Sequence, residues 1–193
     1  MTSLCEALRS VLLDRICHQG PIELSEASER GRGAPVRLLG QTSFWAVRLE
    51  DQHFLPILAE LSSDRSVRKL PDYLIFGEPE VEPTRPTDVA LRVMICELKS
   101  GEAGAAAATR QVQLGKLLAE YLVRLAAYQL GRAEVPKVYP CGLIVSPQFP
   151  VSLRPKGSMR PGKIDYPHTY DKLSAMRVYE IPPGGEIHLE SFF

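Results

Sequence analysis

Three charged side chains flank two apolar segments in the middle of the chain. Pro71-Asp72 opens one segment, and Glu97 and Lys99 close the next. Side chains alternate across a strand, so Glu97 and Lys99 are predicted to share one face, while Leu98 points to the other. A charge that follows a strongly apolar strand is costly to bury without a partner. The pattern therefore predicts a polar site where these two strands meet.

The chemistry expected of this site is metal-assisted hydrolysis of a phosphodiester. Two carboxylates brought together repel each other unless a proton or a metal ion intervenes, and hard oxygen ligands suit Mg²⁺ or Mn²⁺. Such a metal activates water and stabilises charge on phosphorus, while a nearby ammonium group positions or deprotonates the attacking water. Asp72 and Glu97 are the predicted carboxylates, and Lys99 is the predicted ammonium.

The first part of the chain supplies a helix and several short strands. Leu4, Leu8, Val11, Leu12 and Ile16 have helical spacing, which predicts an amphipathic helix over 3–17. The polar segment 20–35 is expected to be a loop. Short strands are expected in 36–50 and again in 54–61, where a helix would fit equally well. The runs 72–76 and 89–98 are predicted to be neighbouring strands joined by a long loop.

After the Glu-x-Lys sequence, the strongest helical signal in the chain begins. An alanine-rich start at 103–108 leads into a leucine stripe that ends near Gly131, which predicts a long helix with one buried face. Segment 138–145 is predicted to be a buried strand, 146–165 a basic loop rich in Pro and Gly, and 176–181 and 187–193 two closing strands. Residues 1–193 are predicted to form a single domain.

The order of these elements and charged residues resembles the PD-(D/E)XK nuclease superfamily, over about residues 1–146. The resemblance implies an α/β fold with a restriction-endonuclease-like core, in which helices flank a mixed central β-sheet in αβββαβ order. It implies that Asp72 and Glu97 ligate the metal, that the carbonyl of Leu98 adds a backbone ligand, and that Lys99 serves the attacking water. The expected cofactor is Mg²⁺ or Mn²⁺.

Members of this superfamily often carry a further polar residue on the helix after the Glu-x-Lys sequence. Gln111 and Gln113 are the candidates, and Gln111 is preferred because it lies closer to the apolar stripe. Arg110 lies on the other side of the stripe and could approach a phosphate. For each of these residues, a solvent contact at the boundary of the stripe is an equal alternative. An upstream acidic residue often completes the site, and Glu6 is the positional candidate, although the helical wheel puts it on the polar face.

Composition and charge limit the remaining function classes. The 193 residues are 45% hydrophobic and 24% charged, which is sufficient for a hydrophobic core, and the net charge is zero. Any nucleic-acid contact must therefore be local. Four widely spaced cysteines favour buried thiols over a zinc or iron-sulfur site. With no cleavable signal sequence and no membrane-spanning segment, the chain is expected to be soluble, intracellular and cytoplasmic, without a membrane partner.

The basic loop is the predicted contact for the nucleic-acid backbone, because phosphate binding needs only cations near the active face. Its cations are Arg154, Lys156, Arg160 and Lys163. A surface loop without a ligand is an equal alternative. Tyr166, His168 and Tyr170 follow it, and ordinary packing is favoured over base stacking for them.

Three functions remain in competition. The leading one is a metal-dependent nuclease acting on DNA or RNA, with affinity supplemented by a homodimer or by a partner protein. The second is a catalytically silent nucleic-acid-binding or structural module that retains the nuclease fold. The third is an unrelated α/β domain, in which Pro71-Asp72 is a strand-entry turn and Glu97 and Lys99 form a solvent-facing ion pair worth less than about 1 kcal/mol.

Overall fold

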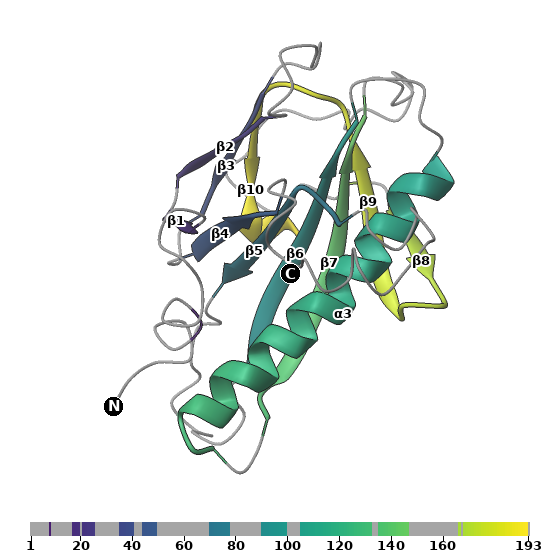
Figure 1. Ribbon diagram of the computed structural model, residues 1–193. Coiled ribbons are helices and arrows are strands. Elements are labelled where there is room, and N and C mark those ends of the chain that lie inside the picture. The colour runs from purple at the N-terminus through teal and green to yellow at the C-terminus, as the bar shows by residue number, and fades with distance from the viewer. Residues whose placement is uncertain are drawn as a thin grey trace.

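The computed structural model describes residues 8, 17–19, 21–25, 35–40, 44–49, 70–77, 90–99, 105–132, 135–146, 166 and 168–192. Within these ranges the chain is α/β, with two β-sheets and one long helix (Figure 1). In chain order the elements are β1 (Cys17–Gln19), β2 (Ile22–Leu24), β3 (Val36–Leu39), β4 (Phe44–Arg48), β5 (Tyr73–Gly77), β6 (Ala90–Leu98), α3 (Ala105–Gln129), β7 (Lys137–Val145), β8 (His168–Asp171), β9 (Met176–Ile181), β10 (Glu186–His188) and the 3-10 helix η3 (Leu189–Ser191).

The larger sheet is mixed and has seven strands in the order β1-β4-β5-β6-β7-β9-β8. Strands β4, β5 and β6 form an antiparallel meander. The pairing then changes from antiparallel to parallel: β6 leads through α3 to β7, which runs in the same direction as β6, and β9 also pairs with β7 in parallel. A parallel pair needs a crossover of this kind, and α3 supplies it. The three-stranded sheet has the order β10-β3-β2.

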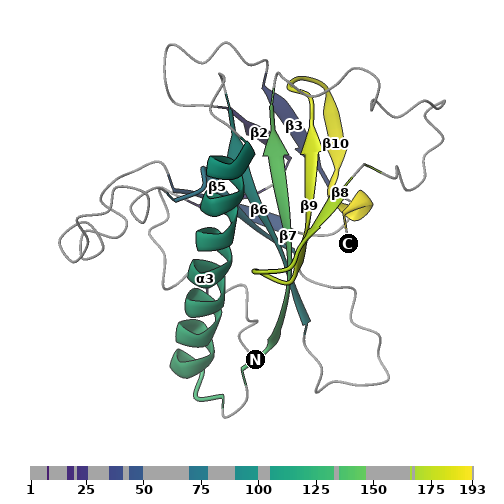
Figure 2. The same cartoon turned by 90° about the vertical axis from the view of Figure 1, so that its right-hand side faces the viewer.

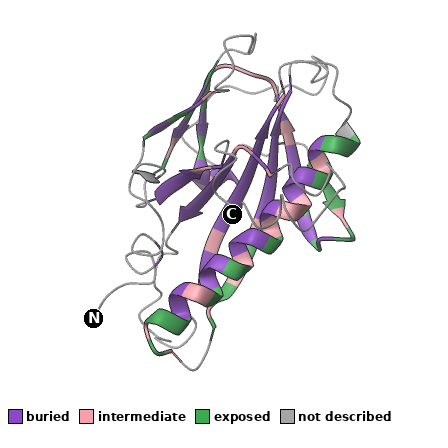
Figure 3. Cartoon of the chain, in the orientation of Figure 1, coloured by how far each residue is buried: buried purple, intermediate pink, exposed green. Residues whose placement is uncertain are grey.

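The two faces of the larger sheet are covered by different elements. Helix α3 lies on one face, and the smaller sheet lies on the other (Figure 2). Alternate residues of each strand accordingly belong to two cores. Val93 and Ile95 of β6 pack with α3, whereas Met94 and Cys96 pack with residues of the smaller sheet. The central strands are buried along most of their length, while the outer face of α3 is exposed (Figure 3).

Helix α3 ends in a defined capping motif. Gly131 adopts the left-handed conformation with φ of 63°, Arg132 N–H donates to the carbonyl of Ala127, and Gly131 N–H donates to the carbonyl of Tyr128. This is the Schellman arrangement, in which glycine is favoured because it has no Cβ. The predicted end of the helix near Gly131 is thereby confirmed. No helix among the described residues is long and apolar enough to cross a membrane.

The main strand predictions are confirmed: 36–50 contains β3 and β4, the runs 72–76 and 89–98 correspond to β5 and β6, and 138–145 and 176–181 correspond to β7 and β9. Cys96 and Cys141 are buried free thiols, as expected. Of the expected first helix, only Leu8, which is helical and buried, and Cys17 are among the described residues. The segment 54–61 and most of the basic loop also fall outside them.

Four short strands and a 3-10 helix correct the sequence-based expectations. The predicted helix over 3–17 extends too far, because Cys17 already belongs to β1. The predicted loop 20–35 contains β2, and β8 was not expected. The last predicted strand is replaced by β10 followed by η3. Each of these strands has only three or four residues, so its pairing with a partner strand decides its structure more than its own sequence does.

Candidate functional site

The carboxylate-bearing strand ends meet on the face of the large sheet that α3 covers. Tyr73 of β5 pairs with Cys96 of β6, and the next position of this antiparallel register brings Asp72 opposite Glu97. Side chains directly opposite in such a pair have Cβ atoms about 5 Å apart. The predicted alternation is confirmed, because Ile95 packs with the α3 core and Leu98 packs in the other core. Glu97 and Lys99 therefore share the α3 face.

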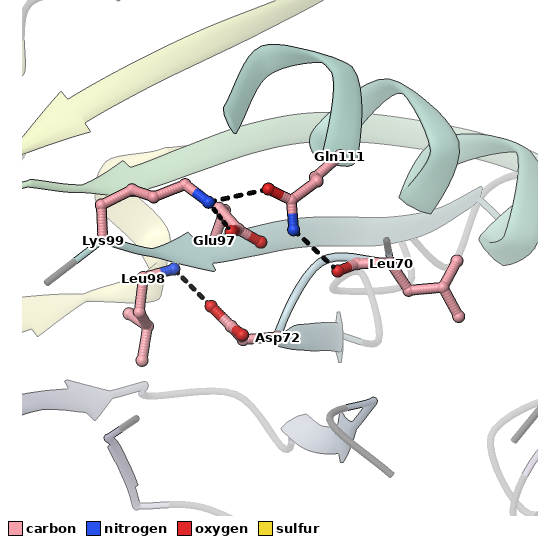
Figure 4. A network of polar contacts seen from close by, with 6 residues as sticks. All are labelled: Leu70, Asp72, Glu97, Leu98, Lys99 and Gln111. Atoms are coloured by element: carbon pink, nitrogen blue, oxygen red, sulfur yellow. Dashed lines mark hydrogen bonds and ion pairs between the residues drawn. The ribbon is translucent and has the colours of Figure 1, made fainter. Parts of the chain in front are cut away.

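Asp72 is also bound to the backbone of β6. Its Oδ2 accepts a hydrogen bond of 2.5 Å from the N–H of Leu98 (Figure 4). The neighbouring N–H of Lys99 points the other way and donates to the carbonyl of Val145 in β7. The N–H and C=O of one strand residue point to the same side, so the carbonyl of Leu98 lies on the strand edge that faces Asp72. Two carboxylates and one carbonyl are thus gathered at the end of β6.

Lys99 connects this strand end to α3. Its Nζ donates to Oε1 of Glu97 and, over 2.7 Å, to Oε1 of Gln111 (Figure 4). The amide nitrogen of Gln111 in turn donates to the carbonyl of Leu70 at 3.1 Å. Gln111 therefore links the end of β6 to the segment that enters β5. Because the oxygen and the nitrogen of the Gln111 amide both have hydrogen-bond partners, the orientation of this amide is fixed.

Glu97 is buried with only part of its hydrogen-bonding capacity satisfied. The residue is 2% exposed, and its Oε2 has no hydrogen-bond partner among the described residues. Burial is the main cause that raises the pKa of Glu97 from 4.5 to about 8; the charge of Asp72 adds to the rise and Lys99 opposes it. A carboxylate in this position is stabilised by a cation at its open oxygen. The solvent-facing ion pair considered from the sequence is excluded by this burial.

The donor set fits a hard divalent cation that keeps part of its water shell. Asp72, Glu97 Oε2 and the carbonyl of Leu98 are all oxygen ligands, and Mg²⁺ is commonly held by one or two carboxylates together with water and substrate phosphates. Among the described residues, no group of three or more His, Cys, Asp or Glu side chains could hold a metal by itself. A metal here would therefore depend on the backbone carbonyl and on water.

The other sequence candidates lie apart from this cluster or outside the described residues. Gln113 donates to Asp171 of β8 at 2.9 Å, so it faces away from Lys99. Arg110 is exposed on α3, one residue before Gln111. The upstream candidate Glu6 and the basic-loop cations are outside the described residues; the latter are Arg154, Lys156, Arg160 and Lys163.

Two features were not anticipated from the sequence: a contact within the site and an acidic residue two strands away from Glu97. The carbonyl of Leu70 orients Gln111, and a backbone group of this kind has no sequence signal. Glu180 of β9 falls in the same cross-strand row as Glu97, because Glu97 pairs with Ile144 and Ile144 pairs with Glu180. The alternation of Met176, Val178 and Glu180 could have placed Glu180 on this face, but not in this row.

The chain was also compared with known proteins. No protein-family model, no curated protein and no solved structure matches it.

Proposed function

We propose that this protein is a metal-dependent nuclease with a restriction-endonuclease-like core, which hydrolyses phosphodiester bonds of DNA or RNA. The observation that carries the proposal is the half-satisfied carboxylate of Glu97, buried beside Asp72 and Lys99. The order of meander, helix α3 and parallel strand β7 supports the proposed core. Asp72, Glu97 and Lys99 are all present with the side-chain chemistry that such hydrolysis needs.

In this proposal Asp72, Glu97 and the Leu98 carbonyl hold Mg²⁺ or Mn²⁺. The bound ion supplies Lewis-acid stabilisation of the charge that develops on the phosphate. Binding of a cation at Glu97 Oε2 also offsets the burial cost that raises the pKa of this carboxyl. Asp72 has a second role: its carboxylate accepts a hydrogen bond from the N–H of Leu98 and so holds the Leu98 peptide in position.

Lys99 orients the attacking water or neutralises a phosphate oxygen. An ammonium group has three donors, and two are used here by Glu97 and Gln111, which leaves one for the substrate or for water. Gln111 is a positioning residue, because it holds the Lys99 ammonium through a contact that Leu70 fixes from the other side. A group held in place before the reaction needs little reorganisation during it.

The experiment is a cleavage assay on single- and double-stranded DNA and RNA with Mg²⁺ or Mn²⁺. Glu97→Gln and Lys99→Met are expected to reduce cleavage at least about 100-fold, because each removes a charge used in the reaction. Glu120→Gln and Lys116→Met are the matched controls, since this carboxylate and ammonium form a separate pair on α3 at 3.6 Å. Both controls should cleave normally.

Cleavage that continues in Glu97→Gln and Lys99→Met at the rate of the controls would contradict the proposal. If no substrate is cleaved but nucleic acid binds in the presence of a chelator, the catalytically silent module replaces it. If neither cleavage, metal binding nor nucleic-acid binding depends on Asp72 and Glu97, the unrelated α/β domain is the remaining interpretation.

A further inference from the structure

A second polar surface lies on the face of the large sheet that α3 does not cover, at the beginning of β7. Val138 packs against the α3 core, so Lys137 and Tyr139 point to the opposite face by strand alternation. Both of these side chains are exposed, whereas Cys141 and the following residues of β7 are buried. The strand thus emerges from the core at this end and presents a cation and an aromatic ring.

Strands β8 and β9 extend this surface. Arg177 of β9 pairs with Cys141 of β7 and, on its other side, with Tyr170 of β8. These registers place Arg177 and Tyr170 on the same face as Tyr139, with Tyr139 two residues before the position opposite Arg177 in β7. Arg177 thus lies between the two tyrosines, directly opposite Tyr170 in the antiparallel pair and on the strand next to Tyr139. Lys137, Tyr139, Tyr170 and Arg177 are called the sheet-end patch below.

The aromatic rings of the sheet-end patch are available to a ligand. Tyr139 is 46% exposed and Tyr170 is 61% exposed. On the same face, Tyr166 and Tyr179 are buried against Phe192, with ring centroids 5.0 and 4.9 Å from it. The core therefore uses some tyrosines of this face and leaves two at the surface. Among Tyr166, His168 and Tyr170, the packing expected from the sequence is found at Tyr166, but Tyr170 stays exposed.

The positive charges of the sheet-end patch indicate which kind of ligand it binds. Lys137 Nζ lies 4.9 Å from the ring centroid of Tyr139, and Arg177 is exposed beside Tyr170. In strands β6 to β9, none of the described side chains on this face is acidic. Cations that alternate with exposed rings match a phosphate backbone and unstacked bases, which stack on aromatic side chains irrespective of sequence. A duplex keeps its bases stacked internally and offers only its phosphates.

We propose that the sheet-end patch binds single-stranded nucleic acid. This inference rests on the proposed nuclease function for its biological role, and it names single strands as the preferred substrate class. The patch lies at the start of β7, whereas Glu97 lies at the end of the parallel strand β6. Tyr139 lies five residues before Ile144, the β7 partner of Glu97, so at a rise of about 3.3 Å per residue the two are about 16 Å apart along the strand and on opposite faces of the sheet. The patch therefore holds substrate and takes no part in the chemistry.

The experiment measures fluorescence polarisation of labelled 20-nucleotide oligo-dT, oligo-A RNA and a 20-base-pair duplex with the full chain in the presence of EDTA. Binding under these conditions is independent of the metal site. The double variant Tyr139→Ala/Tyr170→Ala should bind the single strands at least about tenfold more weakly, which corresponds to the loss of base stacking on one ring. Tyr121→Ala/Tyr128→Ala is the control, because these tyrosines are also exposed but lie on α3, away from the patch.

A second variant tests the cations. Lys137→Gln/Arg177→Gln should lower the slope of log affinity against log salt by about 1.4, since each phosphate contact to a single strand contributes about 0.7. Arg124→Gln on the exposed side of α3 should leave the slope unchanged. Thermal unfolding of each variant verifies that it is folded.

The outcomes separate this inference from the proposed function. Glu97→Gln should bind the single strands normally and fail to cleave them, whereas Tyr139→Ala/Tyr170→Ala should raise KM and leave kcat unchanged. If single strands bind but are not cleaved under any condition, the proposed nuclease function is contradicted and the proposed binding patch is retained. Three results would overturn the patch as a single-strand site. They are equal affinity of the two tyrosine double variants for single strands, binding of the duplex that is as tight or tighter, and full competition by an acidic peptide such as polyglutamate.

Discussion

The carboxylate of Asp72 accepts a hydrogen bond from the backbone N–H of Leu98, so the two strands of the candidate site are joined at the point where Glu97 emerges. The bond fixes the peptide between Glu97 and Leu98 relative to β5. The position of Glu97 therefore depends on Asp72 through the backbone as well as through charge. Effects on metal binding and effects on folding must be separated when either residue is changed.

Asp72→Asn is predicted to separate these two effects. The amide oxygen of Asn still accepts from Leu98 N–H, so the free energy of unfolding should change by less than about 1 kcal/mol. Loss of the negative charge should weaken Mn²⁺ binding at least about tenfold. Isothermal titration calorimetry and urea unfolding measure the two quantities. Asp171→Asn is the control, because this β8 carboxylate accepts from the N–H of Ser174 in the following turn, and its Mn²⁺ affinity should equal that of wild type. Equal Mn²⁺ affinity of Asp72→Asn and Asp171→Asn would count against the site.

The raised pKa of Glu97 predicts how stability depends on pH in the metal-free protein. Its folded pKa of about 8 exceeds the ordinary 4.5, so the folded state holds a proton that the unfolded state releases between these values. The contribution of this group to the free energy of unfolding is therefore greatest below pH 4.5 and falls as pH rises toward 8. Glu97→Gln stays neutral and should lose this dependence.

Urea unfolding at pH 5 and pH 8 in EDTA measures this difference. The wild-type change between the two pH values should exceed that of Glu97→Gln by more than about 1 kcal/mol, which corresponds to one pKa unit. Saturating Mn²⁺ should reduce the wild-type dependence, because the cation favours the ionised carboxylate. The opposite result would be a free energy of unfolding that rises from pH 5 to pH 8 in wild type, relative to Glu97→Gln, in EDTA. It would show that Glu97 is stabilised as an anion without metal.

Gln111→Ala is predicted to weaken both the fold and the reaction. The change removes the acceptor of Lys99 and leaves the Leu70 carbonyl without this donor, and it should destabilise the protein by about 1–3 kcal/mol. With Lys99 held only by Glu97, kcat should fall while KM changes little. Gln113→Ala is the control, since its bond to Asp171 lies outside the site. Steady-state kinetics of the two variants compare them directly, and equal kcat values would exclude the positioning role.

Gly115→Ala is predicted to disturb the site through packing alone. A Cβ at this position would stand 2.6 Å from Cγ of Pro71 and would overlap Cγ2 of Ile95. Overpacking of this kind costs about 1–3 kcal/mol. Because Pro71 precedes Asp72 and Ile95 leads to Glu97, a shift of either strand should also weaken Mn²⁺ binding. Thermal unfolding and calorimetry test this; a variant with unchanged melting temperature would show that α3 can move away without cost.

The sequence by itself determined the central elements and the chemistry available to them. The β-prone apolar runs that form β5, β6 and β7 identify these strands, and the helical spacing of the leucine stripe identifies α3. Strand alternation was sufficient to place Glu97 and Lys99 on one face and Leu98 on the other. These features depend on residues that are close in the chain, so the local sequence pattern predicts them.

Only the tertiary structure decided which groups meet. The register that sets Asp72 opposite Glu97, the Leu70 carbonyl that orients Gln111 and the row that contains Glu180 all join residues distant in the chain. The short strands β2 and β10 form because both pair with β3, and their own sequences carry too few residues to specify a strand. Burial of Tyr166 likewise follows from its stacking on Phe192, which is distant in the chain. Contacts of this kind are selected by the packing of the whole sheet, because a one-residue change of register would move every side chain to the other face.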